Sequence, residues 1–364
     1  MNYLNDYADE NKLPIMDQLA FERITNDIGK EQFRLDLAEY IAKERPVFPL
    51  KKITLYDVRK SFFALQKQDV TEYCKLNDNN VMEKYDDYKY AYKDYGLGVI
   101  DAPPIFNYCS DFFMHDLRMS CGSYGYKSPV DRWNEADNLW GVFGPIWRNV
   151  NQEQELSVSI YNMTFRLGAY IATQFKPIVA KTIYNMTDAK TVLDTSMGWG
   201  DRLTAFYASN ATHYIGCDPN PNTFKRYKKM IEFWDKFTGG KKTTQIYNCG
   251  AEDLPWDEIK NVDCAFTSPP YFSTERYNEG GEKQELQSWF KFNEYESWRD
   301  NFYLPVSQKT FDSLNESGIM MVNILDPKVK GKRYRSGDEL VDMLLPNFLG
   351  QIGMRIMQRP QGAS

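Results

Sequence analysis

A chain of 364 residues is long enough for one large domain or two ordinary ones, with a substantial buried core. Its formal net charge of −6 excludes a generally basic nucleic-acid binder, so any contact with phosphates must come from a local basic surface. The polar N-terminus and six cysteines without a C-x-x-C pair indicate a cytoplasmic location, and no run is apolar enough to cross a membrane. With only two histidines, His115 and His213, no metal site is expected.

The N-terminal region, residues 1–150, is predicted to be helical or irregular, and its sequence assigns it no role. Apolar residues recur at helical spacing over 33–42 and again over 55–66. Pro46 and Pro49 separate these two segments, because proline ends a helix.

Strand-sized and helix-sized segments alternate over residues 151–364, which predicts an α/β domain with a parallel, doubly wound sheet. We expect strands at 191–195, 214–217, 243–247, 262–266, 318–325 and 352–357. We expect helices at 157–173, 201–209, 222–237, 256–260, 295–314 and 337–345.

The turn after the first predicted strand suits the close approach of a ligand. The strand runs through Asp194 into Ser196, Gly198 and Gly200. Glycines let the backbone approach a ligand without interference from a Cβ atom, and the following helix N-terminus supplies N–H donors. The full G-x-G-x-x-G pattern is absent, which disfavours a dinucleotide.

Acidic residues follow the second and third predicted strands. Asp218 comes about 20 residues after the glycine turn, where a carboxylate can accept both hydroxyls of a ribose. Glu252 and Asp253 follow the third strand and can accept a hydrogen bond from an adenine amino group. The glycine turn and these acids, in this order, predict an adenosine site without phosphates.

A rigid loop follows the fourth predicted strand. That strand ends at Thr267, and Ser268, Pro269, Pro270 and Tyr271 come next. Two consecutive prolines cannot lie inside a sheet, because neither donates to a ladder. A hydroxyl, carbonyls flanked by residues without N–H groups, and an aromatic ring suit a planar amino group held by its two hydrogens. A plain turn after a buried strand is the alternative.

Together these motifs resemble the S-adenosylmethionine-dependent methyltransferases that modify exocyclic amino groups of nucleic-acid bases, the N6-adenine and N4-cytosine group. The resemblance spans roughly residues 160–357 and implies a Rossmann-like methyltransferase sheet with S-adenosylmethionine as the cofactor. Ser268–Tyr271 match the catalytic [D/N/S]-P-P-[Y/F/W] motif. The implied cofactor contacts are Phe175, Lys176, Asp194, Ser196, Gly198, Gly200, Asp218, Glu252, Asp253 and Thr267.

The implied reaction is methyl transfer to a DNA base that leaves its stack and moves onto Tyr271 or Phe272. Serine at 268 places N4-cytosine slightly ahead of N6-adenine. An RNA-base methyltransferase, or a non-catalytic member that binds nucleic acid or a partner, are the alternatives. A looser similarity to methyltransferases of large phages and giant viruses would place the protein in a host cytoplasm or a virion. The oligomeric state is not predicted.

Two further segments are expected to contact nucleic acid. Basic residues after the fifth predicted strand suit phosphates: Lys328, Lys330, Lys332, Arg333 and Arg335. The insertion at 273–294, which carries Arg276, is either a lid that orders on DNA or a surface loop without a role.

The C-terminus departs from the family pattern, in which the sheet closes with an antiparallel sixth and seventh strand. Here 352–357 can supply only the sixth strand. The sheet is therefore incomplete, or the N-terminal region completes it, or the chain is truncated.

Overall fold

The structure, a computed structural model, describes residues 2–69, 74–76, 96–123, 126–135, 155–166, 169–329 and 331–356. The chain divides into two compact units. One consists of Met1–Lys52 with His115–Ala172, and the other of Ile53–Met114 with Thr173–Ser364. The expected boundary near residue 150 does not coincide with this division.

The smaller unit is helical. Its helices are α1 Gln18–Ile28, α2 Lys30–Glu44, α7 Pro129–Asn134 and α9 Val158–Arg166, while α6 Tyr108–Met119 crosses the division between the units. The indole of Trp133 packs edge-on against Phe48 and Tyr161 and donates to the Pro46 carbonyl at 2.7 Å. A buried aromatic ring whose N–H has a partner fixes this small core.

The larger unit contains a five-stranded sheet in which all neighbouring strands are parallel. In order across the sheet the strands are β6 Thr243–Tyr247, β5 His213–Cys217, β4 Thr191–Asp194, β7 Val262–Thr267 and β9 Leu314–Val322. β4 and β7 are neighbours in space but not in sequence, so the strand order reverses between them. This confirms the predicted doubly wound, Rossmann-like α/β fold and creates a switch point, where ligands bind in such sheets.

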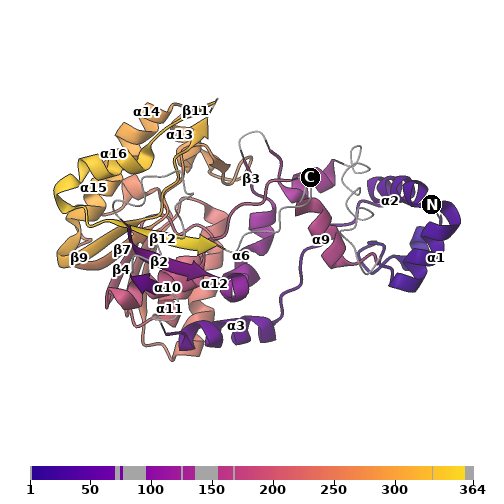
Figure 1. Ribbon diagram of the computed structural model, residues 1–364, viewed down its shortest axis with the longest axis horizontal. Helices are drawn as coiled ribbons and strands as arrows, with labels where there is room; N and C mark the ends of the chain where they lie inside the picture. The colour runs from indigo at the N-terminus through magenta and orange to yellow at the C-terminus, as the bar shows by residue number, and fades with distance from the viewer. Residues whose placement is uncertain are drawn as a thin grey trace. The chain divides into compact units, whose positions relative to one another are not determined.

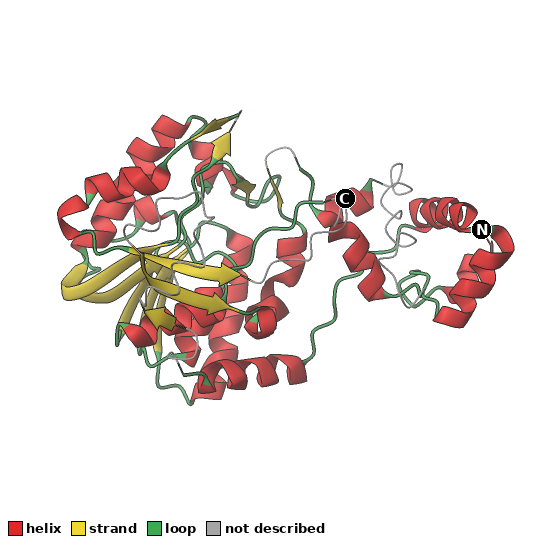
Figure 2. Ribbon diagram, in the orientation of Figure 1, coloured by secondary structure: helices red, strands yellow, loops and turns green. Residues whose placement is uncertain are grey.

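Helices cover both faces of this sheet (Figures 1 and 2). On one face lie α10 Pro177–Met186, α11 Asp201–Ala208 and α12 Pro221–Thr238, and on the other lie α15 Leu304–Asp312 and α16 Ser336–Met343. The shorter elements are α13 Ser288–Lys291, α14 Tyr295–Trp298, β3 Gly122–Ser123, β8 Glu275–Arg276, β10 Lys328–Val329 and β11 Lys332–Arg333. Covered on both faces, β4, β5 and β7 are made largely of buried apolar residues.

Several predicted elements differ in the structure. The helix expected at 157–173 ends at Arg166, and residues 169–173 are irregular. The helix expected at 295–314 is divided into α14, a π-helical segment at Arg299–Tyr303 and α15, and β9 begins at Leu314 rather than at 318. The helix expected at 256–260 is absent, because this described stretch is a turn and irregular chain that follows a 3₁₀ turn at Ala251–Asp253. β9 ends at Val322 rather than at 325, although the backbone N–H of Asn323 still donates to the Thr267 carbonyl of β7.

The last strand does not join the five-stranded sheet as its predicted sixth member. β12 Gln351–Ile356 pairs in parallel with β2 Gly96–Ala102, which pairs antiparallel with β1 Cys74–Leu76. These strands form a separate three-stranded sheet among the described residues, and Met357 lies outside them. The N-terminal region thus supplies a partner strand for β12, but in this separate sheet, and it does not complete the five-stranded one.

Helix α3 Leu55–Lys67 belongs to the sheet-bearing unit and packs within it. The Phe62 ring stacks on Trp234 of α12, with 4.1 Å between ring centroids and an interplanar angle of 17°. At the end of α3, the Lys181 ammonium donates to the Gln66 carbonyl at 3.1 Å. These contacts explain why residues 53–114 belong with the sheet.

We predict that Phe62→Ala destabilises the sheet-bearing unit by roughly 3–5 kcal/mol, because it removes a large buried ring and leaves a cavity. Phe62 is 1% exposed, whereas its neighbour Phe63 is 45% exposed. Phe63→Ala is therefore the matched control, with a loss well under half as large. Urea unfolding followed by far-UV circular dichroism measures both, and equal losses would contradict this account of α3.

Candidate active site

The end of β4 is organised by a buried ion pair. The carboxylate of Asp194 accepts from the guanidinium Nε of Arg202 at 2.9 Å and from the hydroxyl of Tyr214 at 2.7 Å. The side chains of Asp194 and Arg202 are 0% and 4% exposed. Burial alone would lower the pKa of Arg202, but the adjacent carboxylate raises it above its ordinary value. Asp194 therefore positions neighbouring groups from inside the core.

Ser196, Gly198 and Gly200 form the tight turn that the sequence predicts. Gly198 and Gly200 have φ values of 54° and 76°, in the region that favours glycine. A Cβ on Gly200 would lie 2.7 Å from the end of the flexible Met230 side chain, which would have to shift. The Ser196 carbonyl accepts from Arg202, which ties this turn to the ion pair.

Asp218 lies at the end of β5, beside this turn. Its carboxylate accepts from the backbone N–H of Gly198 at 3.0 Å and of Asn220 at 2.9 Å, and from the Thr223 hydroxyl at 3.2 Å. Desolvation raises the pKa of Asp218 to about 6, although these hydrogen bonds oppose the rise. The predicted ribose acid therefore lies next to the predicted glycine turn.

Glu252 and Asp253 follow β6, as predicted, and both face a cation. The ammonium of Lys291 donates to Glu252 Oε1 and lies 3.8 Å from the Asp253 carboxylate. Glu252 Oε2 is buried and has no hydrogen-bond partner among the described residues. Since an unsatisfied buried acceptor is costly, this oxygen is suited to a donor that a ligand would bring.

Ser268 lies directly after β7 and is held by two donors. Its hydroxyl accepts from Arg202 Nη1 at 3.0 Å and from Asn323 Nδ2 at 3.1 Å. Arg202 thus contacts both the Asp194 turn and the loop that contains Pro269 and Pro270. The predicted role of Ser268 as an acceptor is already filled by protein groups.

Tyr271 is half-buried, and its hydroxyl accepts from Asn323 Nδ2 at 2.5 Å. Burial raises the pKa of Tyr271 to about 12, so the phenol keeps its proton at neutral pH. Thr267 ends β7 with its hydroxyl 3.1 Å from that of Thr195. The predicted catalytic loop is therefore attached to the ends of β4 and β9.

The predicted role of Phe272 in stacking a base is wrong in this structure. Phe272 is 4% exposed, and its ring packs against Tyr295 and Trp298 in the core. Its φ of 53° turns the chain so that consecutive side chains point in different directions. Tyr271 is the aromatic residue of this pair that is not buried.

Phe175 and Lys176 lie just before α10. The Phe175 ring packs edge-on against Phe266 of β7, and the Arg202 guanidinium lies 5.4 Å from its centroid. Lys176 precedes the first turn of α10. Phe175 therefore adds a cation–π contact to the buried ion pair.

The insertion at 273–294 is held against the three strand ends that carry the predicted cofactor residues. Tyr277 packs edge-on against Trp199 of the glycine turn. Asn278 accepts a hydrogen bond at 3.2 Å from the side-chain amide of Asn222, which lies at the start of α12, the helix that follows β5. Lys291 contacts the acids after β6. Arg276 pairs with Glu279 at 2.5 Å and lies over the Trp289 ring. These contacts place the described segment at this edge of the sheet, and a lid that orders on DNA stays a prediction.

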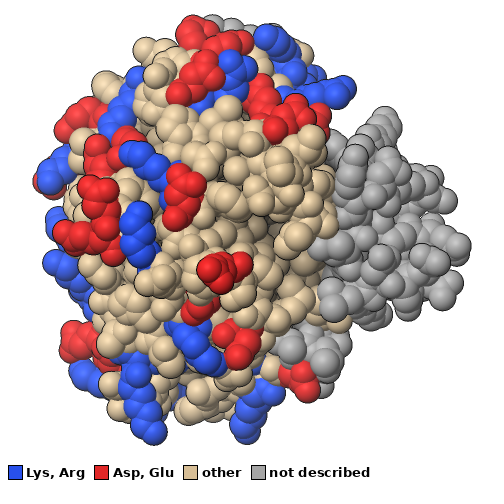
Figure 3. Space-filling model, turned by 90° about the vertical axis from the view of Figure 1, so that its left-hand side faces the viewer, with Lys and Arg blue, Asp and Glu red and all other residues tan. Residues whose placement is uncertain are grey.

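The basic segment after β9 forms the β10–β11 hairpin, with Lys328 opposite Arg333. Lys328, Lys332, Arg333 and Arg335 are exposed, while Lys330 lies outside the described residues. On the face of the molecule shown in Figure 3, the described acidic and basic side chains are interspersed rather than gathered by sign. The described part of this face therefore presents no continuous basic patch for phosphates.

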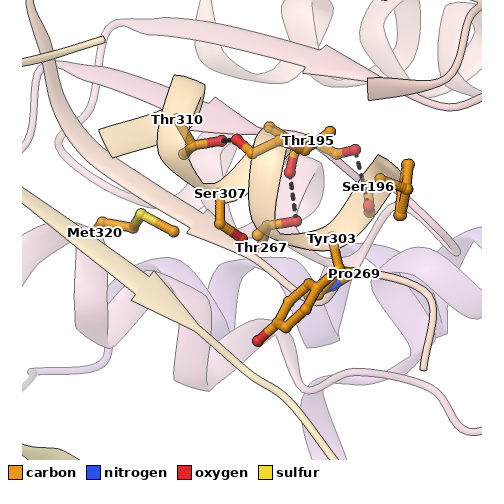
Figure 4. A pocket seen from close by; sticks show the side chains of 10 residues that line it. Thr195, Ser196, Thr267, Pro269, Tyr303, Ser307, Thr310 and Met320 are labelled. Atoms are coloured by element: carbon orange, nitrogen blue, oxygen red, sulfur yellow. Dashed lines mark hydrogen bonds between the residues drawn. The ribbon is translucent and has the colours of Figure 1, made fainter. Parts of the chain in front are cut away.

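A small pocket lies between the strand ends and α15 (Figure 4). Its lining residues are Thr195, Ser196, Thr267, Pro269, Phe302, Tyr303, Val306, Ser307, Thr310 and Met320. Its free space is about that of one water molecule, so it cannot hold a nucleobase in this conformation.

Two residues of this arrangement, Arg202 and Asn323, were not predicted from the sequence. Arg202 has a signal in the sequence, because an acid within an apolar strand needs a cation nearby and Arg202 opens the next helix. Asn323 directly follows the apolar run 319–322, the end of a strand. Within the described residues, no group of three His, Cys, Asp or Glu side chains is placed to hold a metal ion. No described helix is long and apolar enough to cross a membrane.

No protein-family profile and no curated protein matches the chain. Among solved structures it is similar to an rRNA methylase from Streptococcus thermophilus, at 14% identity and a TM-score of 0.31, over 48% of this chain and 81% of that one. It is also similar to a SAM-dependent methyltransferase from Agrobacterium tumefaciens, at 13% identity and a TM-score of 0.32, over 51% and 55%. For an SAH-bound methyltransferase from Podospora anserina, the identity is 12% and the TM-score 0.29, over 42% and 53%. Because these identities and TM-scores are low, the assignment of the fold rests on the strand order and parallel pairing of the five-stranded sheet.

We predict that Arg202→Met lowers the free energy of unfolding by roughly 3–5 kcal/mol, because Asp194 is left buried without its cation. Lys236→Met is the control, since Lys236 pairs with Glu232 at an exposed site on α12. That control should leave unfolding unchanged. Urea titration of both variants measures the difference, and a wild-type midpoint for Arg202→Met would contradict the structural role of the ion pair.

Proposed function

We propose that the protein transfers a methyl group from S-adenosylmethionine to the exocyclic amino nitrogen of a flipped DNA base, with N4-cytosine slightly ahead of N6-adenine. The observation that carries this proposal is the position of Arg202, which donates to both Asp194 and Ser268. Through it, the turn suited to a cofactor and the Ser-Pro-Pro-Tyr loop lie together at the switch point of the sheet. Transfer to an RNA base is the second candidate.

Three features fit the proposed cofactor. Gly198 has open space where a side chain would lie: a Cβ atom at this position would have only the Ser196 carbonyl nearby, at 3.8 Å. The Asp218 carboxylate suits the ribose hydroxyls, and the buried, unpartnered Glu252 Oε2 suits the adenine amino group. When bound, S-adenosylmethionine would supply a methyl group activated by a positively charged sulfur. Lys176 and Phe175 are proposed to border its methionine part.

The proposed chemistry depends on positioning. The lone pair of a base amino group is delocalised into the ring, so the nitrogen is a poor nucleophile. A Pro269 carbonyl that accepts one amino hydrogen would orient the group and favour its lone pair for attack. As the new N–C bond forms, the C–S bond breaks and its electron pair stays on sulfur; the nitrogen then loses a proton to water. Tyr271 keeps its proton at neutral pH and so does not serve as a base; its side chain borders the proposed position of the target base.

Nucleic acid would meet the rim beside this loop. The exposed cations of the β10–β11 hairpin and Arg276 of the insertion are the proposed phosphate contacts. Lys332 pairs with Glu296 at 3.7 Å and lies over the Tyr334 ring at 4.4 Å, so it is held in place on this surface.

A labelling experiment tests the proposal. We expect transfer of labelled methyl from S-adenosylmethionine to unmethylated genomic DNA, with the label in N4-methylcytosine after digestion to nucleosides. Ser268→Ala and Tyr271→Ala should lower kcat by about a hundredfold, since both position the base. Ser317→Ala, the same change at an exposed site, should leave it unchanged. Total RNA serves as the competing substrate. Label in RNA alone favours the second candidate, and label in neither contradicts both.

Binding of the cofactor should depend on pH. Desolvation raises the pKa of Asp218 to about 6, and only the ionised carboxylate accepts two ribose hydroxyls. The Kd for S-adenosylhomocysteine should therefore rise by roughly tenfold for each pH unit below that value. Asp218→Asn should bind weakly without this dependence. Isothermal titration calorimetry measures both, and a wild-type Kd that stays constant between about pH 5 and pH 7 would contradict the role of Asp218.

A further inference from the structure

The Ser268 hydroxyl has no acceptor position left for a substrate. A serine oxygen has two lone pairs, and here Arg202 Nη1 and Asn323 Nδ2 each donate to it, at 3.0 and 3.1 Å. What remains is its own O–H. The amino group of a base is also a hydrogen-bond donor, so it cannot donate to the Ser268 hydroxyl in this arrangement.

Tyr271 has the same polarity. Asn323 Nδ2 also donates to its hydroxyl, at 2.5 Å. The phenol stays protonated at neutral pH and can give its hydrogen outward. Ser268 and Tyr271 thus form a hydroxyl pair that accepts from one shared amide. The two hydroxyls carry two protons, and a hydrogen bond from one hydroxyl to the other uses only one of them. The second proton stays available to a ligand.

Rigid elements fix this polarity. The backbone N–H of Asn323 donates to the Thr267 carbonyl at 2.9 Å, which attaches the residue after β9 to the residue before Ser268. Arg202 is held by the buried Asp194. Groups positioned by a sheet and a buried ion pair cannot easily turn to suit a ligand.

We propose that Asn323, together with Arg202, makes the Ser268–Tyr271 hydroxyl pair a donor that recognises the ring nitrogen beside the target amino group. This inference rests on the proposed function and names the edge of the base that is read. Cytosine N3 and adenine N1 each carry a lone pair next to the amino-bearing carbon. The Pro269 carbonyl would accept an amino hydrogen while the hydroxyl pair donates to the ring nitrogen. Asn323 is a positioning residue that determines specificity.

Base analogues test this polarity. In an oligonucleotide that carries the methylated site, the target base is replaced by its analogue with CH at that ring position, 3-deazacytosine or 1-deazaadenine. Wild-type kcat/KM should fall by roughly tenfold to a hundredfold, since the hydroxyl pair loses its acceptor. Asn323→Asp, whose carboxylate accepts from both hydroxyls, should lower kcat/KM on the natural base and bring the ratio between the two bases to about one. Asn301→Asp, the same change on an exposed helical turn, should keep the wild-type ratio.

The outcomes separate the two proposals. Methylation of natural and deaza bases at equal rates by the wild type overturns the inference and leaves the proposed function standing, as does an unchanged ratio in Asn323→Asp. No labelled base in DNA or RNA overturns both. Neutron diffraction from deuterated crystals gives a readout without turnover. Deuterium on Asn323 Nδ2 directed at Ser268 and Tyr271 supports the polarity, and hydroxyl deuterium directed at an Asn323 oxygen overturns it.

Discussion

The ion pair between Asp194 and Arg202 is the constraint on which the candidate site depends. A buried charge is tolerated only when it is paired and hydrogen-bonded, and Arg202 reaches that state by donating to Asp194, Ser196 and Ser268. The aromatic rings of Phe175 and Phe266 flank the guanidinium. Because each of the three guanidinium nitrogens donates to a different group, the end of β4, the start of α11 and the loop after β7 can adopt few other relative positions. The geometry of the site is thus a consequence of core electrostatics.

Around this centre, the edge of the sheet is assembled from segments that follow different strands. The insertion at 273–294 contacts the loops after β4, β5 and β6 through Tyr277, Asn278 and Lys291. It belongs to the connection between β7 and β9, so a single segment links the proposed cofactor side with the proposed base side. A change in that segment, such as contact with nucleic acid at Arg276, would therefore act on both sides at once.

Much of the fold follows from the sequence because it depends on local pattern. Apolar runs gave the five strands, and a proline pair gave the end of β7. Local pattern does not predict which distant segments pair. β12 pairs with β2, and Asn323 after β9 donates to Ser268 after the neighbouring strand β7. Phe272 shows a second limit, because a positive φ directs it into the core although its neighbour Tyr271 stays half-buried. Phe272 is therefore part of the core rather than a stacking face for a base. The order of residues in the sequence does not reveal such a backbone conformation.

The pairing of β2 with β12 has a consequence for how the chain matures. β2 lies near the start of the sheet-bearing unit and β12 near its end, so their parallel ladder closes a very long loop. Contacts between residues so far apart in the sequence form slowly, because the chain loses conformational entropy on closing the loop before the strand pairing stabilises it. On the ribosome, β2 would emerge long before its partner and expose an unpaired edge for most of synthesis. The short antiparallel strand β1 can cover one side of β2 during that interval, and the other side stays open until β12 has been synthesised.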